Sequence, residues 1–362
     1  MKAYRFIISG GGTGGHLFPA LSIAEGLMQL NPNHKIQFVG ALGKIEMEKV
    51  PQHGFPIRGL WISGFQRGQW KRNLLFAIKL AWSLIHAIWI VLLFRPHMAI
   101  GTGGYASGPL LFIAQILGIK TFVQEQNSYP GITNRLLGKK ADKIAVAYEG
   151  LDRFFPADRI VNAGNPIRKS LLVLPKPDFN LYKELGLNAQ KPVFLLLGGS
   201  LGAQKLNELM AKYMEEIVAC GYQVYWQCGR IYYETYAPLE SESILIRDFI
   251  PNMEAVYAVA DVILSRAGAS TLSELSCVGK PTILIPSINV AENHQLKNAQ
   301  AFVEHQAAVL IEESQADASF KEVVCGLLKD VEQQKRLAEN IRKLAKPKAT
   351  SSIIKHIETL LK

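Results

Sequence analysis

The stretch YRFIISGGGTGGHLFPA, residues 4–20, decides the fold of the first half of the chain. Its apolar beginning, residues 4–9, predicts a short buried strand. An apolar pattern with helical spacing begins at Pro19, a residue that suits the first turn of a helix. A glycine-rich turn between a buried strand and a helix favours anion binding, because the bare backbone can approach a phosphate and the helix N-terminus attracts its charge.

The same glycines also satisfy the fingerprint G-x-G-x-x-G of dinucleotide-binding folds, at Gly10, Gly12 and Gly15. That fingerprint needs an acidic residue at the end of the second strand, where it binds a ribose. The predicted second strand, residues 36–39, lacks such an acid, and the next one along the chain is Glu46. A nicotinamide dinucleotide site is therefore not expected.

A second stretch, PVFLLLGGSLGAQ at residues 192–204, repeats the order of strand, glycine turn and helix. Each half then alternates short apolar runs with helical segments, which predicts parallel sheets covered by helices on both faces. Between the halves, residues 164–179 contain three prolines and mixed charge, which indicates an interdomain connection. The predicted fold class is α/β, with two Rossmann-like doubly wound domains, residues 1–165 and 166–345, facing across a ligand-binding cleft.

Length and composition support globular domains in a reducing compartment. The 362 residues are enough for about two domains with separate cores. The four cysteines form no C-x-x-C pair, so a disulfide scaffold is not expected and the cytoplasm is the simpler location. The N-terminus has no apolar run of signal-peptide length, so a secretory leader is not expected either.

The net charge of +10 lies entirely in the first half of the chain. Residues 1–165 contain 18 Lys and Arg against 8 Asp and Glu, whereas residues 166–362 contain 22 of each kind. Such an excess favours an anionic membrane surface or a nucleic acid as partner, and solubility alone is the alternative explanation. Because the cations are scattered and the sequence has no nucleic-acid-binding motif, we expect the membrane surface and no nucleic acid.

One segment, residues 73–94 (NLLFAIKLAWSLIHAIWIVLLF), approaches the length of a membrane span. Wound as a helix, it places Lys79, Ser83 and His86 in one narrow stripe, and such side chains are costly in the middle of a span. Three interpretations stay open. The flanking tryptophans and cations favour a peripheral membrane patch, and the alternatives are an ordinary buried crossover helix and a true span.

Two further motifs follow predicted strands of the first half. One is GTGGYASGP, residues 101–109, and the other is TFVQEQNSYPG, residues 121–131. The second brings Glu125, Gln126 and Asn127 to the carboxyl edge of a sheet, where ligand groups are held. A capped turn before a helix would use the same residue types, so both interpretations remain.

The densest signal of the second half is DVILSRAGASTLSELSCVGKPTILIP, residues 261–286. Small residues open a helix after its strand, and their N–H groups suit a diphosphate. Glu274 suits either the helix dipole or two ribose hydroxyls. The next residues, PSINVAENHQLKNA at 286–299, carry amide side chains that suit sugar hydroxyls, and a plain polar helix start is the alternative.

Six motifs, in this order and at comparable distances, resemble the MurG family of GT-B type glycosyltransferases. They are GGGTGGHLFPA, GTGGYASGP, EQN, GNPIR, LLLGGSLGA and SRAGASTLSE with the following NHQ. The resemblance runs from Ile8 to about Asn298. It implies an inverting transfer of N-acetylglucosamine from UDP-N-acetylglucosamine to the 4-hydroxyl of the muramyl sugar of lipid I. The product is lipid II, so the resemblance implies a role in peptidoglycan synthesis, and with it in cell wall biogenesis, cell shape and cell division.

The resemblance also implies where each substrate binds. The donor would bind mainly to the C-terminal domain, and lipid I would meet the N-terminal domain at the cytoplasmic face of the bacterial inner membrane. The protein would be peripheral there, and the amphipathic stretch at about residues 346–362 would pack back onto the N-terminal domain.

Donor-binding residues are carried over from the family position by position. They are Thr13, Gly14, Gly15, Asn127, Arg168, Ser200, Ile250, Ala269, Ser270, Thr271, Leu272, Ser273, Glu274 and Gln295. Within this set, Ser200 and the backbone of 269–271 suit the diphosphate, the backbone of Ile250 suits the uracil, and Glu274 suits the ribose.

The side chain that contacts the donor sugar is not decided by the resemblance. The family has Gln at one or both positions that match His294 and Gln295, and only Gln295 is Gln here, so which one contacts the sugar stays open. The chain has no D-x-D motif, so neither a metal-dependent nucleotide-sugar site nor a cofactor is expected.

An inverting displacement needs a base for the acceptor hydroxyl and stabilisation of the leaving diphosphate. His16, at a helix start, is the candidate base, because an imidazole exchanges protons near neutral pH. Glu125 is the alternative base, and His16 would then orient a substrate. The rival functions are another GT-B enzyme, such as a lipid glycosyltransferase or a UDP-sugar epimerase, and a non-catalytic nucleotide-sugar-binding protein.

Overall fold

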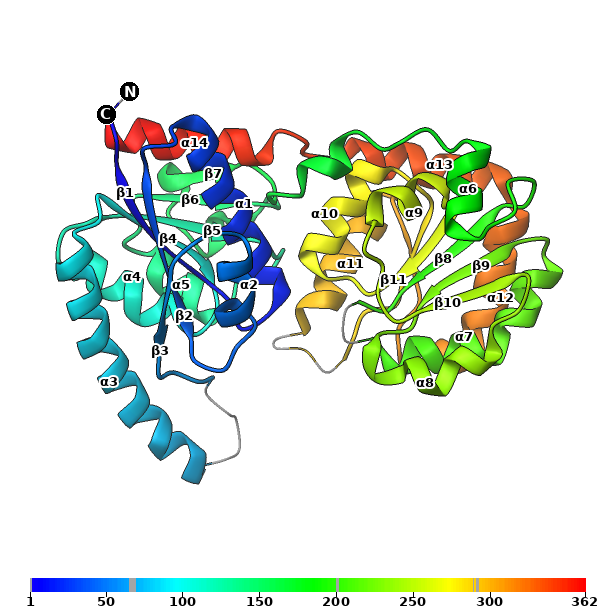
Figure 1. Cartoon of the computed structure of the whole chain (residues 1–362), viewed down its shortest axis with the longest axis horizontal. Helices are drawn as coiled ribbons and strands as arrows, with labels where there is room; N and C mark the ends of the chain where they lie inside the picture. Colours follow the sequence, from blue (N-terminus) through cyan, green and yellow to red (C-terminus); the bar gives the residue numbers. More distant parts are fainter. Residues whose placement is uncertain (1, 65–69, 200–201, 289, 291–292) are drawn as a thin grey trace. The chain divides into compact units, whose positions relative to one another are not determined.

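The structure is a computed structural model that describes residues 2–64, 70–199, 202–288, 290 and 293–362. The chain divides into two compact units (Figure 1). Unit 1 contains residues 1–167 and Lys346–Lys362, and unit 2 contains Arg168–Ala345. Each unit has its own parallel sheet and its own hydrophobic core.

The sheet of unit 1 has seven parallel strands in the order β3-β2-β1-β4-β5-β6-β7. Their bounds are β1 Arg5–Gly10, β2 Lys35–Ala41, β3 Ile57–Leu60, β4 Met98–Gly103, β5 Lys120–Glu125, β6 Lys143–Val146 and β7 Ile160–Asn162. The strand order reverses between β1 and β4, and a crevice at the carboxyl ends of such a pair is the usual ligand site of a doubly wound sheet. Both strands run directly into glycine-rich turns there.

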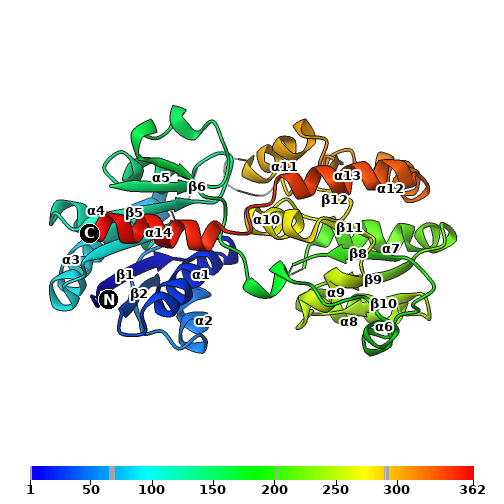
Figure 2. The same cartoon turned by 90° about the horizontal axis from the view of Figure 1, so that it is seen from above.

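Helices cover both faces of this sheet, as Figure 2 shows. They are α1 Gly14–Leu30, α2 Glu46–Gln52, α3 Trp70–Phe94, α4 Ser107–Ile116, α5 Ile132–Gly138 and α14 Ala349–Leu361, with short 3-10 turns η1 Leu151–Arg153 and η2 Ala157–Arg159. Along β1, Phe6 and Ile8 enter the core under α1 and α14, whereas Ile7 enters the core under α3 and α4. This alternation is that of a strand buried on both sides. The C-terminal helix α14 packs closely on α1, where a Cβ at Gly26 would lie 3.0 Å from Thr350.

The sheet of unit 2 has six parallel strands in the order β10-β9-β8-β11-β12-β13. They are β8 Val193–Leu197, β9 Gln223–Gln227, β10 Ile244–Arg247, β11 Val262–Ser265, β12 Thr282–Leu284 and β13 Val309–Leu310. The order reverses between β8 and β11, again beside a glycine turn. The predicted class, α/β with two doubly wound parallel sheets, is confirmed.

The helices of unit 2 also lie on both faces of its sheet. They are α6 Phe179–Leu185, α7 Gln204–Ala219, α8 Tyr233–Tyr236, α9 Met253–Val259, α10 Ala269–Val278, α11 His294–Glu304, α12 Ala316–Lys329 and α13 Val331–Lys343, with 3-10 turns η3 Lys169–Leu172, η4 Arg230–Tyr232 and η5 Ala237–Leu239. The core contains the fully buried rings of Phe194, Trp226 and Phe320.

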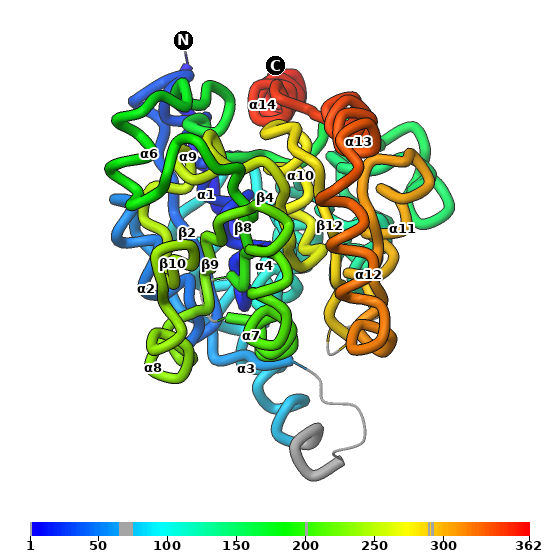
Figure 3. Tube along the Cα trace, turned by 90° about the vertical axis from the view of Figure 1, so that its right-hand side faces the viewer, coloured from blue at the N-terminus to red at the C-terminus, as the bar shows by residue number. Residues whose placement is uncertain are grey.

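The long apolar segment forms α3, which runs past α4 and projects from the body of unit 1 (Figure 1 and Figure 3). Its polar stripe faces the protein, because Ser83 is fully buried and donates to the carbonyl of Trp61 at 3.0 Å. Its opposite face exposes Trp82, Trp89 and several aliphatic side chains. In the part of the chain that the structure describes, residues 75–94 are the one stretch long and apolar enough to cross a membrane, and 22% of it is buried. The helix is therefore not an ordinary buried crossover helix.

Candidate active site

The glycine turns after β1 and β4 of unit 1 pack directly against each other. The N–H of Gly11 donates to the carbonyl of Gly103 at 3.3 Å. A Cβ at Gly10 would overlap Oγ1 of Thr102 on β4, and one at Gly104, which has φ of +93°, would overlap the carbonyl oxygen of Gly11. Side chains at these positions would push the two turns apart, so glycine is required for the approach.

Glu46, at the start of α2, holds the first glycine turn in place. Its Oε2 accepts from the N–H of Gly12 at 2.8 Å and its Oε1 accepts from the N–H of Ala41 at 2.9 Å. The side chain is buried, with 1% of its surface exposed. This role of Glu46 was not predicted from the sequence, although the place of the residue just after β2 and its small neighbours was a usable signal.

His16 lies in the first turn of α1 with its imidazole turned toward the ends of β4 and β5. Its Nδ1 lies 3.1 Å from the carbonyl oxygen of Thr102 and 3.0 Å from Oε1 of Gln126. Both oxygens can only accept, so a neutral His16 ring carries its proton on Nδ1 and keeps the lone pair on Nε2. Within the described residues no hydrogen bond engages Nε2. This atom is able to accept a proton from a substrate.

Glu125, the alternative base, is fully engaged at the end of β5. Its Oε1 accepts from the N–H of Asn127 at 2.9 Å and from Nδ2 of Asn127 at 3.1 Å, and its Oε2 accepts from Nδ2 of Asn134 at 2.9 Å. The side chain is 1% exposed. This is the capped turn that the sequence analysis kept as an alternative for this segment.

Three of the four remaining predicted donor residues of unit 1 lie at the start of α1. Thr13 is its exposed N-cap residue, with an extended backbone, and Gly14 and Gly15 form its first turn. Asn127 is half-buried beyond β5. Thr13, Gly14 and Gly15 therefore lie on the same glycine turn as His16, at the carboxyl edge of the sheet.

Unit 2 contains a cavity of about 540 Å³ at the carboxyl ends of its central strands. It is lined by the glycine turn after β8, by the start of α10 and by the segment before α11, including Gly198, Gly202, Gly268, Thr271, Ser287 and Gln295. Its volume is within the range of small-molecule sites. The cavity brings together Thr271 and Gln295, two residues that the sequence analysis assigned to the donor, and the Oε1 atom of Gln295 accepts from the N–H of Ser287 at 2.9 Å.

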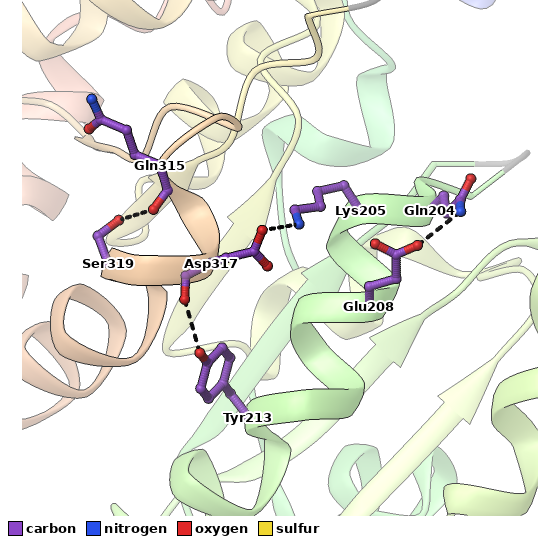
Figure 4. Close-up of polar contacts among 7 residues, drawn as sticks. All are labelled: Gln204, Lys205, Glu208, Tyr213, Gln315, Asp317 and Ser319. Carbon is purple, nitrogen blue, oxygen red and sulfur yellow. Dashed lines mark hydrogen bonds and ion pairs between the residues drawn. The ribbon is translucent and has the colours of Figure 1, made fainter.

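The cations that line this cavity are paired with carboxylates. Arg266, directly after β11, forms an ion pair with Glu313 and donates to the carbonyl of Ile285 at 2.9 Å. Lys205, at the start of α7, lies 2.6 Å from a carboxylate oxygen of Asp317 on α12 (Figure 4) and lowers the pKa of that group by its hydrogen bond. Neither cation was predicted from the sequence as a site residue, although each lies within a few residues of a glycine.

Arg168 and Glu274 are partners in unit 2. The Nε and Nη2 atoms of Arg168 lie 3.1–3.2 Å from the carboxylate oxygens of Glu274 on α10, which is a bidentate arrangement. The side chain of Glu274 is 16% exposed, and this burial raises its pKa while Arg168 opposes the rise. A ribose bound to Glu274, or a diphosphate bound to Arg168, would contact a side chain that is already engaged in this ion pair.

The other predicted donor residues lie on or beside α10. Ala269 and Leu272 are buried, whereas Ser270, Thr271 and Ser273 are half-buried in the first turns of the helix. Ile250 has a buried side chain, which leaves its backbone as the part that a ligand could contact. Ser200 lies outside the described residues. His294 is the first residue of α11.

Metal ligation was also considered for the described residues. Among them, no group of three or more His, Cys, Asp or Glu side chains could hold a metal ion.

Comparisons with known proteins give the family. Residues 6–146 match the glycosyltransferase family 28 N-terminal domain, and residues 193–357 match the glycosyltransferase family 28 C-terminal domain. A relative from Flavobacterium psychrophilum is 51% identical over all of this chain and 99% of its own length. One from Bacteroides fragilis is 44% identical over 98% of this chain and 95% of its own. Both are named UDP-N-acetylglucosamine–N-acetylmuramyl-(pentapeptide) pyrophosphoryl-undecaprenol N-acetylglucosamine transferase.

Solved structures share the fold at low identity. The chain is similar to the crystal structure of Acinetobacter baumannii MurG, with a TM-score of 0.79 and 24% identity over 99% of this chain and 100% of that one. A UDP-N-acetylglucosamine 2-epimerase matches with a TM-score of 0.67 and 14% identity over 98% of this chain and 95% of its own. Because transferases and an epimerase share this architecture, the fold does not separate them, whereas the full-length sequence identity does. The chain is a glycosyltransferase and belongs to glycosyltransferase family 28.

Proposed function

We propose that this glycosyltransferase transfers N-acetylglucosamine from UDP-N-acetylglucosamine to the 4-hydroxyl of the muramyl sugar of lipid I, with inversion, to give lipid II for peptidoglycan synthesis. The observation that carries the proposal is the 51% identity, over the whole chain, to a relative whose name states this transfer. The donor and the lipid acceptor are taken from that name. The roles of Glu274, Ile250 and Gln295 are carried over from the family resemblance, and those of His16, Thr271 and Arg266 are argued from the geometry.

The donor binds mainly in the cavity of unit 2. The first turn of α10, with Thr271 at the cavity wall, offers N–H groups and a positive helix end to the diphosphate. Gln295 reaches the same cavity and suits the hydroxyls of the sugar. Glu274 holds the ribose beside Arg168, and the backbone of Ile250 meets the uracil. Paired cations at the wall, such as Arg266, add charge stabilisation for the leaving UDP.

His16 is the base of the transfer. As the 4-hydroxyl oxygen of the acceptor forms its bond to the anomeric carbon, Nε2 of His16 takes the hydroxyl proton, and UDP leaves with the electron pair of the broken bond. The free lone pair on Nε2 supports this assignment, and the full engagement of both Glu125 oxygens makes that carboxylate the weaker candidate.

The chain associates peripherally with the cytoplasmic face of the inner membrane. The exposed face of α3, with Trp82 and Trp89, supplies apolar and interfacial side chains, and the cationic excess of the first half attracts anionic lipids. This position would give unit 1 access to a lipid-linked acceptor.

The test is UDP release from UDP-N-acetylglucosamine, with and without a lipid I analogue, for the wild type, His16→Ala and the control His53→Ala. His53 is an exposed histidine at the end of α2, paired with Glu25. We expect acceptor-dependent release in the wild type and the control, and a loss of about 10² or more in His16→Ala with donor binding intact. Unchanged release in His16→Ala would move the base to Glu125. No acceptor-dependent release in the wild type would favour an epimerase or a binding protein.

A further inference from the structure

A chain of three buried amide side chains ends on the imidazole of His16. Asn165 and Gln124 lie at its far end, and Gln126 contacts the ring. We infer that Gln126, Gln124 and Asn165 are positioning residues that hold His16 in the tautomer with a proton on Nδ1 and a free lone pair on Nε2. The inference rests on the proposed role of His16 as the base.

Each amide in the chain is oriented by the next. Nδ2 of Asn165 donates to the carbonyl of Gln126 at 3.0 Å, which turns its Oδ1 toward Gln124. Nε2 of Gln124 donates to that Oδ1 at 2.9 Å, so its own Oε1 is left to accept from Nε2 of Gln126. Nε2 of Gln126 also donates to the carbonyl of Thr102 at 2.7 Å. Oε1 of Gln126 is therefore the atom that faces the ring.

Burial makes this orientation costly to change. Gln124, Gln126 and Asn165 are each at most 2% exposed, and Thr102 is fully buried. An amide turned the wrong way would bring two donors or two acceptors together with no water to separate them, and an unsatisfied buried polar group is destabilising. The buried amides therefore favour one orientation, in which Oε1 of Gln126 faces the ring of His16. An oxygen at this place favours a proton on Nδ1.

The ring is also fixed in place. A Cβ at Gly103, which has φ of +104°, would lie 2.7 Å from Nδ1 of His16, so the imidazole packs edge-on against this glycine. Thr102 Oγ1 donates to the backbone carbonyl of His16 at 2.7 Å and holds the first turn of α1 to the end of β4. The amide chain then selects the tautomer of a ring whose position is already set.

Nearby ionisable groups do not supply this control. Glu125 on β5 gives its oxygens to Asn127 and Asn134, and Glu46 on α2 gives its oxygens to backbone N–H groups. Tyr105, after β4, lies with its ring beside Gly12. The described partners of Nδ1 are the carbonyl of Thr102 and Oε1 of Gln126, so the backbone carbonyl and the oriented amide together favour a proton on this ring nitrogen.

The first test observes the tautomer directly in the full-length protein. Histidine labelled with ¹⁵N gives separate signals for protonated and unprotonated ring nitrogens, and His16→Asn identifies the His16 signals among the eight histidines. We expect the wild type to show a protonated Nδ1 and an unprotonated Nε2. The opposite tautomer in the wild type would overturn the inference without any variant of the amide chain.

The second test changes the contacting amide. Gln126→Met removes one of the two acceptors of Nδ1 at similar length and leaves the carbonyl of Thr102 in place. We expect part of the protein to adopt the other ring tautomer, with a loss of about tenfold in kcat and KM for the donor unchanged. An unaltered His16 tautomer together with an unaltered kcat would contradict the inference. If Gln126→Met does not fold, Asn165→Ser, at the far end of the chain, is expected to shift the same signals by a smaller amount.

The third test uses a charged variant to separate positioning from structure. In Gln126→Glu, a carboxylate next to the ring favours the imidazolium, so the acidic limb of the kcat profile is expected to move to higher pH by about one unit. The control Gln115→Glu places its carboxylate near Thr121, at the amino end of β5, the opposite end of the strand from Gln126. Its acidic limb is expected to stay where it is, and a limb that moves in neither variant would count against the inference.

The outcomes also separate the two proposals. If the inferred tautomer is present but His16→Ala retains acceptor-dependent turnover, the amide chain positions a residue that is not the base, and the proposed role of His16 fails. If His16→Ala is inactive but the ring has the opposite tautomer, the proposed base stands and the positioning inference fails.

Discussion

Glu46 shows how one buried carboxylate can set the shape of a ligand-binding turn. Its two oxygens join the glycine turn after β1 to the end of β2, through the N–H groups of Gly12 and Ala41. A Cβ at Gly11 would lie 2.2 Å from the carboxyl carbon, so the carboxylate packs directly on the bare backbone. The position of His16 therefore depends on an acid that need not touch any substrate.

The substitution Glu46→Gln tests this role at nearly constant volume. An amide offers one acceptor where two backbone donors need one each, so the variant turns an NH₂ group against an N–H group. We expect the free energy of unfolding to fall by about 1–3 kcal/mol, with a matching loss of turnover as the glycine turn relaxes. Urea unfolding measures the first effect. Glu48→Gln, on the same helix with 69% of its side chain exposed, is the control, and equal stability of the two variants would contradict the role.

Residues such as Glu46 and Gln126 mark the limit of what could be predicted from the sequence. The glycine turns and His16 stand out locally, because their residue types are unusual at that spacing. The partners of His16 do not, since Gln126 lies 110 residues away and Asn165 lies a further 39 residues along the chain. Such contacts depend on the order of strands in the sheet, which local periodicity does not contain.

At the scale of elements, the succession of strand, glycine turn and helix was predictable from apolar periodicity, and both sheets confirm it. The orientation of α3 did not follow in the same way. Its helical wheel has one polar stripe and a wide apolar face, which suits several partners. In the structure Ser83 turns inward together with Ala87, Ile90 and Val91 and donates to the carbonyl of Trp61, whereas Trp82 and Trp89 lie outside.

The exposed face of α3 leads to a prediction on membrane binding. The double variant Trp82→Gln with Trp89→Gln removes two side chains that are 57% and 62% exposed, so folding stability should be nearly unchanged. Binding to anionic lipid vesicles in a sedimentation assay is expected to weaken by about tenfold or more, because each indole loses an apolar contact with the interface. Phe179→Gln, an exposed aromatic of unit 2, is the control. Equal vesicle binding by the double variant and the wild type would exclude this face of α3 as the membrane contact.

At the scale of the whole chain, distant segments meet at the amino edge of the sheet in unit 1. The N–H of Tyr4, before β1, donates to Nδ1 of His34, before β2, at 3.0 Å, and the hydroxyl of Tyr4 donates to the carbonyl of Leu361 in α14 at 3.3 Å. His97, before β4, accepts from the N–H of Arg5 through its own Nδ1 at 2.9 Å. This edge needs neutral imidazoles, whereas the opposite edge carries the catalytic candidate. Acid should therefore loosen the body of the unit.

The pH dependence of stability follows from His34. Burial lowers its pKa, and the nearby Glu358 only partly opposes that effect. In the unfolded chain a histidine has a pKa of about 6.5. As the pH falls through this value, the unfolded state therefore binds a proton before the folded state does. The free energy of unfolding should thus be steady above about pH 7 and fall as the pH drops, by at most about 1.4 kcal/mol per pH unit for this one proton. In His34→Gln the amide oxygen can still accept from Tyr4 without titrating, so urea unfolding at about pH 7.5 and pH 5 should show a smaller difference than in the wild type. The exposed His305, changed to Gln, serves as the control, and a difference in His34→Gln equal to that of the wild type would show that this contact does not contribute to the loss of stability in acid.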